Sequence, residues 1–225
     1  MNRSKPTRVI LVRHGQTEWN DGARFQGHLD SPLTAAGEAQ AAAIGRRLAS
    51  EKIVALYSSD LGRARQTAGL ISLSVKLTPQ LDERLRERAL GIFQGLTRDE
   101  VALRFPEEMR RYYSRDPHHI VPGGQSVMQH FQLGSSCLEE IALRHRGENV
   151  VVVTHCGLVQ GMFRQVTGLG FEAPRRFAIR NAAYNVFLRD EAGWSLETWG
   201  DISHYPGDCL STRGFHVENY TREVQ

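Results

Sequence analysis

Two continuous runs of apolar residues constrain the fold of this 225-residue chain more than any other feature. Residues 8–12 (RVILV) and 150–153 (VVVV) lack the apolar/polar alternation of a half-exposed strand, and residues 53–57 (IVALY) form a third run. Strands that are buried on both faces of a parallel sheet have this pattern. Residues 34–49, 61–70 and 126–144 have helical spacing of apolar residues. The alternation of strand and helix predicts an α/β fold.

Two capping boxes predict where helices begin. Thr97 is followed three residues later by Glu100, and Ser126 by Gln129. Between these starts, residues 116–125 (DPHHIVPGGQ) are rich in Pro, Gly and His and predict a loop. We expect residues 96–125 to form a lid or wall within a single domain spanning residues 1–225. The tail, residues 200–225, has no clear period, and we expect it to pack loosely or to mediate assembly.

Composition narrows the class of protein. Hydrophobic residues make up 40% of the chain and charged residues 24%, which is typical of a folded globular protein and excludes a disordered or fibrous one. The net charge is +3, and the basic residues are spread along the chain instead of forming runs, so we expect no nucleic-acid partner. All but three of the 28 basic residues are Arg, whose planar guanidinium suits phosphate and carboxylate. Codon bias is the simpler explanation of that excess, so the composition permits a phosphate site without arguing for one.

The cysteines and the N-terminal segment bear on the cellular compartment of the protein. Cys137, Cys156 and Cys209 are too few and too far apart for a disulfide framework or a paired-cysteine zinc site. The apolar run before Arg13 is too short for a signal sequence or a membrane span. We therefore expect a cytoplasmic protein with no membrane association.

A histidine follows each of the two most apolar runs. Residues 9–12 are followed by Arg13 and His14, and residues 150–153 by Thr154 and His155. Ligands of open α/β sheets bind outside the carboxyl ends of the strands, where two such histidines can meet. One histidine alone would be explained by a hydrogen bond that closes the strand turn. Its repetition in the same context favours a functional site.

Arginines near these histidines point to an anion. Arg13 precedes His14, and the segment after residues 53–57 supplies Arg63 and Arg65 close to a helix start. Guanidinium groups and helix N-termini both favour phosphate. The residues alone do not choose between Arg63 and Arg65.

A carboxylate is harder to select from the charged segment at residues 82–88. Asp82, Glu83 and Glu87 lie there among arginines, and an exposed charged stretch is the simplest explanation. Glu87 differs because residues 89–91 (ALG) follow it and suggest that the chain turns inward.

The segments LVRHGQTEWN, FQGHLDSPLTAAGEAQA, YSSDLGRARQTA, LRERALGIFQG and VVVVTHCG together resemble the histidine phosphatase superfamily, the phosphoglycerate mutase-like family. The resemblance covers nearly the whole chain in the right order. It implies a three-layer α/β/α sandwich with a largely parallel central sheet and an active site at the carboxyl ends of the strands.

The resemblance also implies a role for each matching residue. His14 becomes the nucleophile that accepts the phosphoryl group, Arg13, Arg65 and His155 bind its oxygens, and Glu87 is the proton donor. No metal or other cofactor is implied, because arginines supply the positive charge.

Further positions match those that line the phosphate pocket in relatives: Asn20, Gln26 with its neighbour Gly27, and the backbone amide of Cys156. Phe93 stands where relatives often have Trp, Gln125 where many have Glu, and Cys156 where Gly is usual. The Gln125 departure leaves substrate preference open.

Phosphoryl transfer to a histidine places separate demands on the nucleophile, on the surrounding cations and on the proton donor. Transfer to a neutral imidazole divides one displacement into two easier steps, and the transition state spreads negative charge over three oxygens. We expect Arg13, Arg65 and a protonated His155 to surround that charge. Glu87 must hold a proton for the leaving oxygen and then act as a base toward water.

We predict a metal-independent phosphomonoester hydrolase with a small-molecule substrate, and a homodimer by resemblance. A phosphoglycerate mutase is the alternative, because relatives of that type use an arginine pair in the region of Arg110 and Arg111. A binding module for phosphorylated partners is a third possibility.

Two other enzyme classes fit the residues less well. A cysteine phosphatase needs Arg six residues after its Cys, but Met162 stands there after Cys156. A metal hydrolase needs several matched ligands, and the adjacent pair His118 and His119 is the only close one.

Overall fold

A six-stranded mixed sheet, in the order β3-β2-β4-β1-β5-β6, forms the centre of the computed structural model, which describes residues 5–205. The strands are β1 Thr7–Arg13, β2 Ile53–Ser58, β3 Gln80–Leu81, β4 Asn149–Thr154, β5 Tyr184–Asp190 and β6 Gly193–Asp201. The α-helices are α1 Glu18–Asp21, α2 Ala35–Leu48, α3 Gly62–Val75, α4 Arg98–Arg104, α5 Pro106–Tyr113, α6 Val127–Arg144 and α7 Cys156–Thr167.

The first four strands of that order are parallel. β4 lies between β2 and β1, while β5 and β6 add an antiparallel edge beside β1. The predicted α/β fold with a largely parallel sheet is therefore confirmed. The antiparallel pair was not predicted, because β5 and β6 lack a continuous apolar run.

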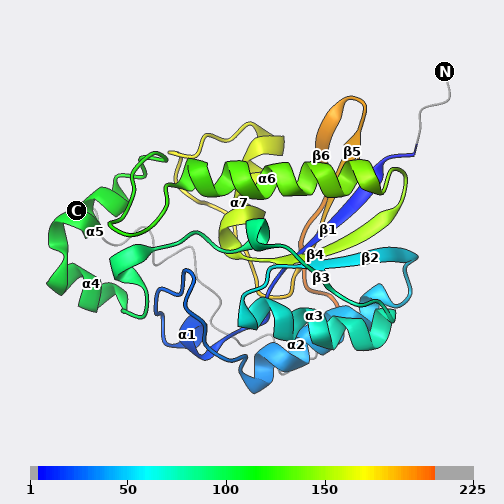
Figure 1. Cartoon of the computed structure of the whole chain (residues 1–225), viewed down its shortest axis with the longest axis horizontal. Coiled ribbons are helices and arrows are strands. Elements are labelled where there is room, and N and C mark those ends of the chain that lie inside the picture. Colours follow the sequence, from blue (N-terminus) through cyan, green and yellow to red (C-terminus); the bar gives the residue numbers. More distant parts are fainter. Residues whose placement is uncertain (1–4, 206–225) are drawn as a thin grey trace.

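Alternate residues of the central strands pack on opposite faces, which produces the three layers. Val9 and Leu11 of β1 belong to the core formed with α6 and α7, whereas Ile10 and Val12 belong to the core formed with α2 and α3. Figure 1 shows α6 and α7 on one side of the sheet and α2 and α3 on the other. Both faces of the strands are covered, so both must be apolar.

Capping side chains set the helix starts. Thr97 and Ser126 form the predicted capping boxes with Glu100 and Gln129 at the N-termini of α4 and α6. The side chain of Thr34 accepts from the backbone of Gly37 and starts α2. The three helices predicted from spacing are α2, α3 and α6.

Helices α4 and α5 lie at one end of the molecule, over a small separate core that includes Phe93, Val101 and Met109 (Figure 1). They belong to the segment 96–125. Of the predicted tail, residues 200–205 complete β6 and a turn, and the remaining part, with Cys209, lies outside the described residues. The extent of a single domain over 1–225 stays a prediction. No helix in residues 5–205 is long and apolar enough to cross a membrane.

Candidate active site

The register of the parallel strands brings the two predicted histidines together. Arg13 of β1 pairs with Thr154 of β4, so His14 and His155 are the next residues on neighbouring strands. The backbone N–H of His14 donates to the carbonyl oxygen of Thr154 at 2.9 Å, which continues the ladder. The ring centroids of His14 and His155 are 5.2 Å apart.

His14 is held as a neutral imidazole with a defined tautomer. Its Nδ1 lies 2.8 Å from the carbonyl oxygen of Gly15, and a carbonyl can only accept, so Nδ1 carries the proton. Nε2 therefore has a free lone pair. Burial, together with the charges of Arg63 and Arg13, lowers the pKa of His14 well below its usual range.

The tight turn after His14 requires glycine. A Cβ on Gly15 would lie 2.5 Å from the carbonyl oxygen of Gly37 in α2. Backbone atoms cannot move aside as a flexible side chain can. Gly15 thus permits the close packing of β1's end against α2.

His155 is completely buried beneath the pocket, and its Nε2 lies 2.8 Å from Oγ of Ser59. Burial and the charge of Arg63 lower the pKa of His155 well below its usual range. The expectation that His155 is protonated is wrong for the free site, because desolvation and nearby cations disfavour a second positive charge. Its Nδ1 is buried without a hydrogen-bond partner within the described residues.

Arg13 and Arg63 supply the buried positive charge. Nη1 of Arg13 donates to the carbonyl oxygen of Ile179 at 2.7 Å. Arg63 donates to the carbonyl oxygens of Leu29 and Gly27 and forms an ion pair with Asp30 at 2.7 Å. In the part of the chain described, the buried Nε atoms of both arginines have no partner.

The structure corrects the choice of Arg65. Arg63 is 1% exposed and lines the pocket, whereas Arg65 is exposed and does not. Two residues along a helix correspond to a rotation of about 200°, which turns the two side chains to opposite faces. The sequence carried a signal for this: Arg63 shares its face with Ala64, Thr67 and Ala68 of the buried side of α3.

Glu87 lies over the N-terminus of α7. Its carboxylate accepts from the backbone N–H of Gly157 at 3.2 Å and from that of Arg88 at 2.9 Å. A Cβ on Gly157 would lie 2.4 Å from Oε1 of Glu87, so glycine makes room for the carboxylate.

His130 of α6 is a neighbour of Glu87 that sequence reasoning missed. Its Nε2 donates to the carbonyl oxygen of Arg86 at 2.9 Å and lies 4.0 Å from Glu87 Oε1. Burial lowers the pKa of His130 and keeps it neutral near pH 7.

The predicted residues Asn20, Gln26 and Gly27 also line the pocket. Asn20 lines the pocket, and its Oδ1 accepts from Asn181, whose amide also donates to the carbonyl oxygen of His14 at 2.9 Å. Gln26 donates to Thr17 through Nε2 at 3.0 Å, and its buried Oε1 has no partner among residues 5–205. Gly27 contributes its carbonyl oxygen, which holds Arg63. Asn181 is far from His14 in the sequence, and no local pattern around it predicts that it belongs to the site.

Cys156 is the first residue of α7, so its backbone N–H has no partner within the helix. Its Sγ accepts from Nη1 of Arg175 at 3.6 Å. The free thiol is half-buried and lines the pocket.

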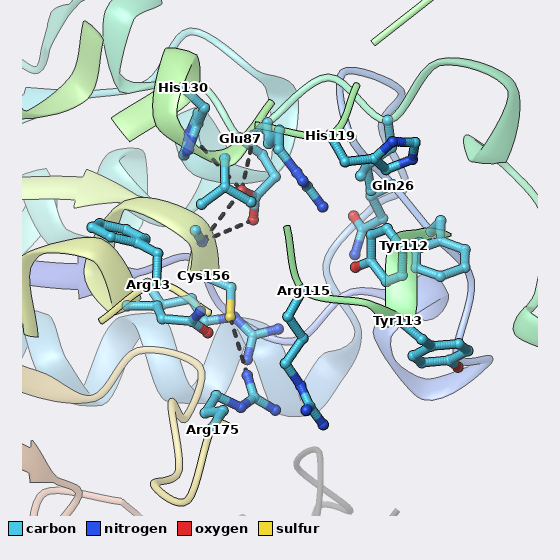
Figure 2. A pocket seen from close by; sticks show the side chains of 18 of the residues that line it. Arg13, Gln26, Glu87, Tyr112, Tyr113, Arg115, His119, His130, Cys156 and Arg175 are labelled. Carbon is cyan, nitrogen blue, oxygen red and sulfur yellow. Dashed lines mark hydrogen bonds and ion pairs between the residues drawn. The ribbon is translucent and has the colours of Figure 1, made fainter. Parts of the chain in front are cut away.

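A pocket of about 260 Å³ lies at this site (Figure 2), and His155 is not among the residues that line it. The predicted residues that do line it are Arg13, His14, Asn20, Gln26, Gly27, Glu87 and Cys156. Its walls also carry arginines and aromatic residues from distant segments, among them Arg88, Arg98, Tyr112, Tyr113, Arg115 and Arg175. Figure 2 shows Glu87 and His130 on one side of this space and Arg13 and Cys156 on another.

The arginine pair that favours a mutase lies outside the pocket lining. Arg110 and Arg111, the pair that favours a mutase, are 73% and 66% exposed, form ion pairs with Glu107 and Glu108 of the same helix, and do not line the pocket. Across residues 5–205, no group of three or more His, Cys, Asp or Glu residues could hold a metal ion.

Comparison with known proteins identifies the family. The pattern of the histidine phosphatase superfamily (branch 1) matches residues 9–202. This chain belongs to the histidine phosphatase superfamily. The resemblance inferred from the motifs is thus confirmed, and so is the enzyme class, which includes both phosphatases and phosphoglycerate mutases.

Relatives carry both kinds of name. The chain is 39% identical to the metal-independent phosphoserine phosphatase of Arabidopsis thaliana, over 94% of this chain and 89% of that protein. It is 38% identical to phosphoglycerate mutase-like protein 4 of the same plant, over 92% and 90%. Among solved structures, Bacillus stearothermophilus YhfR superposes with a TM-score of 0.82 at 30% identity, over 88% of this chain and 98% of that one.

Proposed function

We propose that this histidine phosphatase superfamily member hydrolyses phosphomonoesters through a phosphohistidine at His14 and without a metal ion. The ring of His14 is the observation that carries the proposal. Because Nδ1 donates to the carbonyl oxygen of Gly15, Nε2 is left as the nucleophile. The lowered pKa of His14, caused by burial and by Arg63 and Arg13, keeps that lone pair available near pH 7.

Fixed positive charge supports the transfer step. The transition state spreads charge over three phosphoryl oxygens, and donors that are already in place stabilise it without reorganisation. We assign this role to Arg13 and Arg63, which backbone carbonyl oxygens hold in place through Nη1 of Arg13 and through both Nη atoms of Arg63. Neutral His155 adds a donor: if Ser59 donates to Nε2, the proton of the ring lies on Nδ1.

Glu87 completes the reaction as acid and base. His14 Nε2 forms a bond to phosphorus as the ester P–O bond breaks, and the leaving oxygen takes a proton from Glu87. Water then loses a proton to Glu87 and attacks phosphorus, the P–N bond breaks, and inorganic phosphate leaves. The backbone N–H groups of Arg88 and Gly157 hold the carboxylate in position.

Phosphatase is preferred over mutase because of where the arginine pair lies. A mutase must retain its substrate and return the phosphoryl group to it, for which Arg110 and Arg111 were the candidates. Both point away from the pocket and pair with glutamates of α5. Phosphoserine, named for the Arabidopsis relative, is the first substrate to test.

The remaining expectations are part of the proposal. Residues 96–125 act as a wall of the pocket, supported by Tyr112, Arg115 and His119 in its lining. A cytoplasmic location is supported by the free thiols of Cys137 and Cys156. The homodimer stays a prediction.

The test is to trap the intermediate. The chain is mixed with ³²P-labelled phosphoserine and with a labelled phosphoglycerate, quenched in alkali, and digested to locate label. We expect alkali-stable label on the peptide that contains His14, and release of phosphate.

His14→Ala should remove the label and reduce turnover by at least about 10⁴-fold. His118→Ala, at an exposed histidine outside the pocket lining, is the matched control and should label normally. Wild-type protein that never labels contradicts the proposal and favours a binding module. Fast conversion of 3- to 2-phosphoglycerate with negligible phosphate release favours a mutase.

A further inference from the structure

The outer part of the pocket contains more positive charge than one phosphoryl group requires. Beyond the residues assigned to catalysis, its lining includes Arg24, Arg88, Arg98, Arg115, Arg164 and Arg175. Glu87 and Asp116 are the only carboxylates among the described lining residues, and Asp116 is exposed. Arg24 is used in an ion pair with Glu100 at 2.8 Å.

Arg115 enters the pocket through an unusual backbone conformation. It follows the end of α5 and has a φ of 61°, in the left-handed region that a non-glycine residue seldom adopts. Strain of this kind concentrates at binding and catalytic sites. Figure 2 shows the guanidinium groups of Arg115 and Arg175 in the lower part of the view, with that of Arg175 nearer to Cys156.

Arg175 reaches the pocket from the loop between α7 and β5. Its Nη1 lies 3.6 Å from Sγ of Cys156, the first residue of α7 and the neighbour of His155. The guanidinium therefore contacts a side chain at the N-terminus of α7. Arg88 marks the other side of the pocket, where it stacks over the ring of Tyr112 at 5.3 Å.

Arg164 fixes the wall that carries Arg175. It is 2% exposed and donates to the carbonyl oxygens of Gly170 and Ala173, the latter at 2.8 Å. Arg175 and Arg115 both lower the pKa of Arg164, in addition to burial, and Glu172 opposes them. Arg115 and Arg175, which come from two other segments, therefore both lie close enough to Arg164 to repel its positive charge.

We propose that Arg115 and Arg175 form a subsite for a second anionic group on the substrate, a carboxylate or a second phosphate, carried by the same molecule whose phosphoryl group meets His14. The inference rests on the proposed phosphatase function and adds its substrate class. Like charges gathered at one side of a pocket are stabilised when an anion lies between them. A site built to pair with an anion discriminates against the analogue that lacks it.

Matched substrate pairs test the subsite. O-phosphoserine and O-phosphoethanolamine differ by one carboxylate, and glucose 1,6-bisphosphate and glucose 6-phosphate differ by one phosphate. The readout is the ratio of kcat/KM within each pair, for wild type, Arg115→Gln, Arg175→Gln and the control Arg110→Gln, an exposed arginine outside the pocket.

We expect wild type to prefer the second anion in at least one pair, and the pair shows whether it is carboxylate or phosphate. Arg115→Gln and Arg175→Gln should each lower that ratio by about 10- to 100-fold, and Arg110→Gln should leave it unchanged. An unchanged ratio in both pocket variants overturns the subsite, as does the absence of any preference in wild type. Either result leaves the phosphatase standing if His14 still labels. Wild type that neither labels nor releases phosphate refutes the proposed function itself.

Discussion

The inner end of the pocket and its outer wall are built differently. At the inner end Arg13, His14, Arg63 and His155 are all less than 5% exposed and lie at strand ends or on the first turn of α3. At the outer wall Tyr112, Arg115 and Arg175 are half-buried and lie on a short helix or in loops. The side chains of Arg13, His14 and Arg63 bond to backbone carbonyl oxygens and that of His155 to the Ser59 hydroxyl, whereas Arg175 contacts a thiol.

This contrast suggests that the inner end stabilises the transition state and that the outer wall determines which substrate is preferred. Side chains that the backbone fixes before substrate arrives stabilise a transition state without moving. Groups on loops are easier to exchange without disturbing the core. We therefore expect changes at the inner end to affect every substrate alike and changes at the outer wall to alter the preference between substrates.

After the loss of the nucleophile in His14→Ala, the largest expected effect concerns the inner arginine Arg63. Arg63→Met should lower kcat/KM by about 10²- to 10³-fold for all phosphomonoesters, because a preformed donor at the phosphoryl oxygens is lost. Arg65→Met, two residues away on the exposed face of α3, should change it by less than about twofold. Steady-state kinetics measure both.

Arg63 is buried, so thermal unfolding must accompany the kinetics, and Arg63→Lys provides a variant that keeps the charge. A larger loss in Arg65→Met than in Arg63→Met would mean that α3 presents its other face to the pocket.

The second prediction concerns Gly157, at the boundary between the two regions. Gly157→Ala should lower kcat by about 10- to 100-fold, because its Cβ would lie 2.4 Å from Glu87 Oε1 and displace the proton donor. Gly69→Ala is the control: nothing lies within 4 Å of its Cβ in α3, and we expect it to raise stability by about 0.5–1 kcal/mol. A fully active Gly157→Ala enzyme would remove Glu87 from the mechanism.

The third prediction uses the buried histidines. The pKa of His14 and that of His155 are lowered by burial, so below pH 6.5 the unfolded chain binds protons that the folded chain does not. Stability is therefore complete above pH 6.5 and falls as the pH decreases from 6.5 toward the lowered values. The slope is at most about 1.4 kcal/mol per pH unit for each histidine.

Urea unfolding at pH 7.5, 6.5 and 5.5 measures that slope. His14→Asn should reduce it, whereas His118→Asn, at an exposed position, should leave it unchanged. Identical slopes in wild type and His14→Asn would show that folding does not lower the pKa of His14.

The smallest expected effect is that of a chelator. Because guanidinium groups supply the charge at the inner end, excess EDTA should change kcat/KM by less than about twofold. Phosphate release from phosphoserine, with and without added Mg²⁺ or Mn²⁺, measures it. Activity that appears only after a divalent ion is added would contradict the arginine-based mechanism.

Much of the inner end could be predicted from the sequence. The apolar runs fix β1, β2 and β4, since only strands covered on both faces need to be apolar without alternation. A histidine directly after β1 and another after β4 must then lie at one edge, because parallel strands end together. The short outer helices and the β5-β6 hairpin lacked such a pattern.

What the sequence determined by itself is this local order: which segments form strands, where helices begin, and which residues follow the strand ends. The tertiary structure decided that α3 turns Arg63 and not Arg65 inward, that His155 is neutral, and that Arg115 and Arg175 share a wall. Periodicity is a property of neighbouring residues, whereas burial, charge state and convergence depend on segments that are distant in the chain.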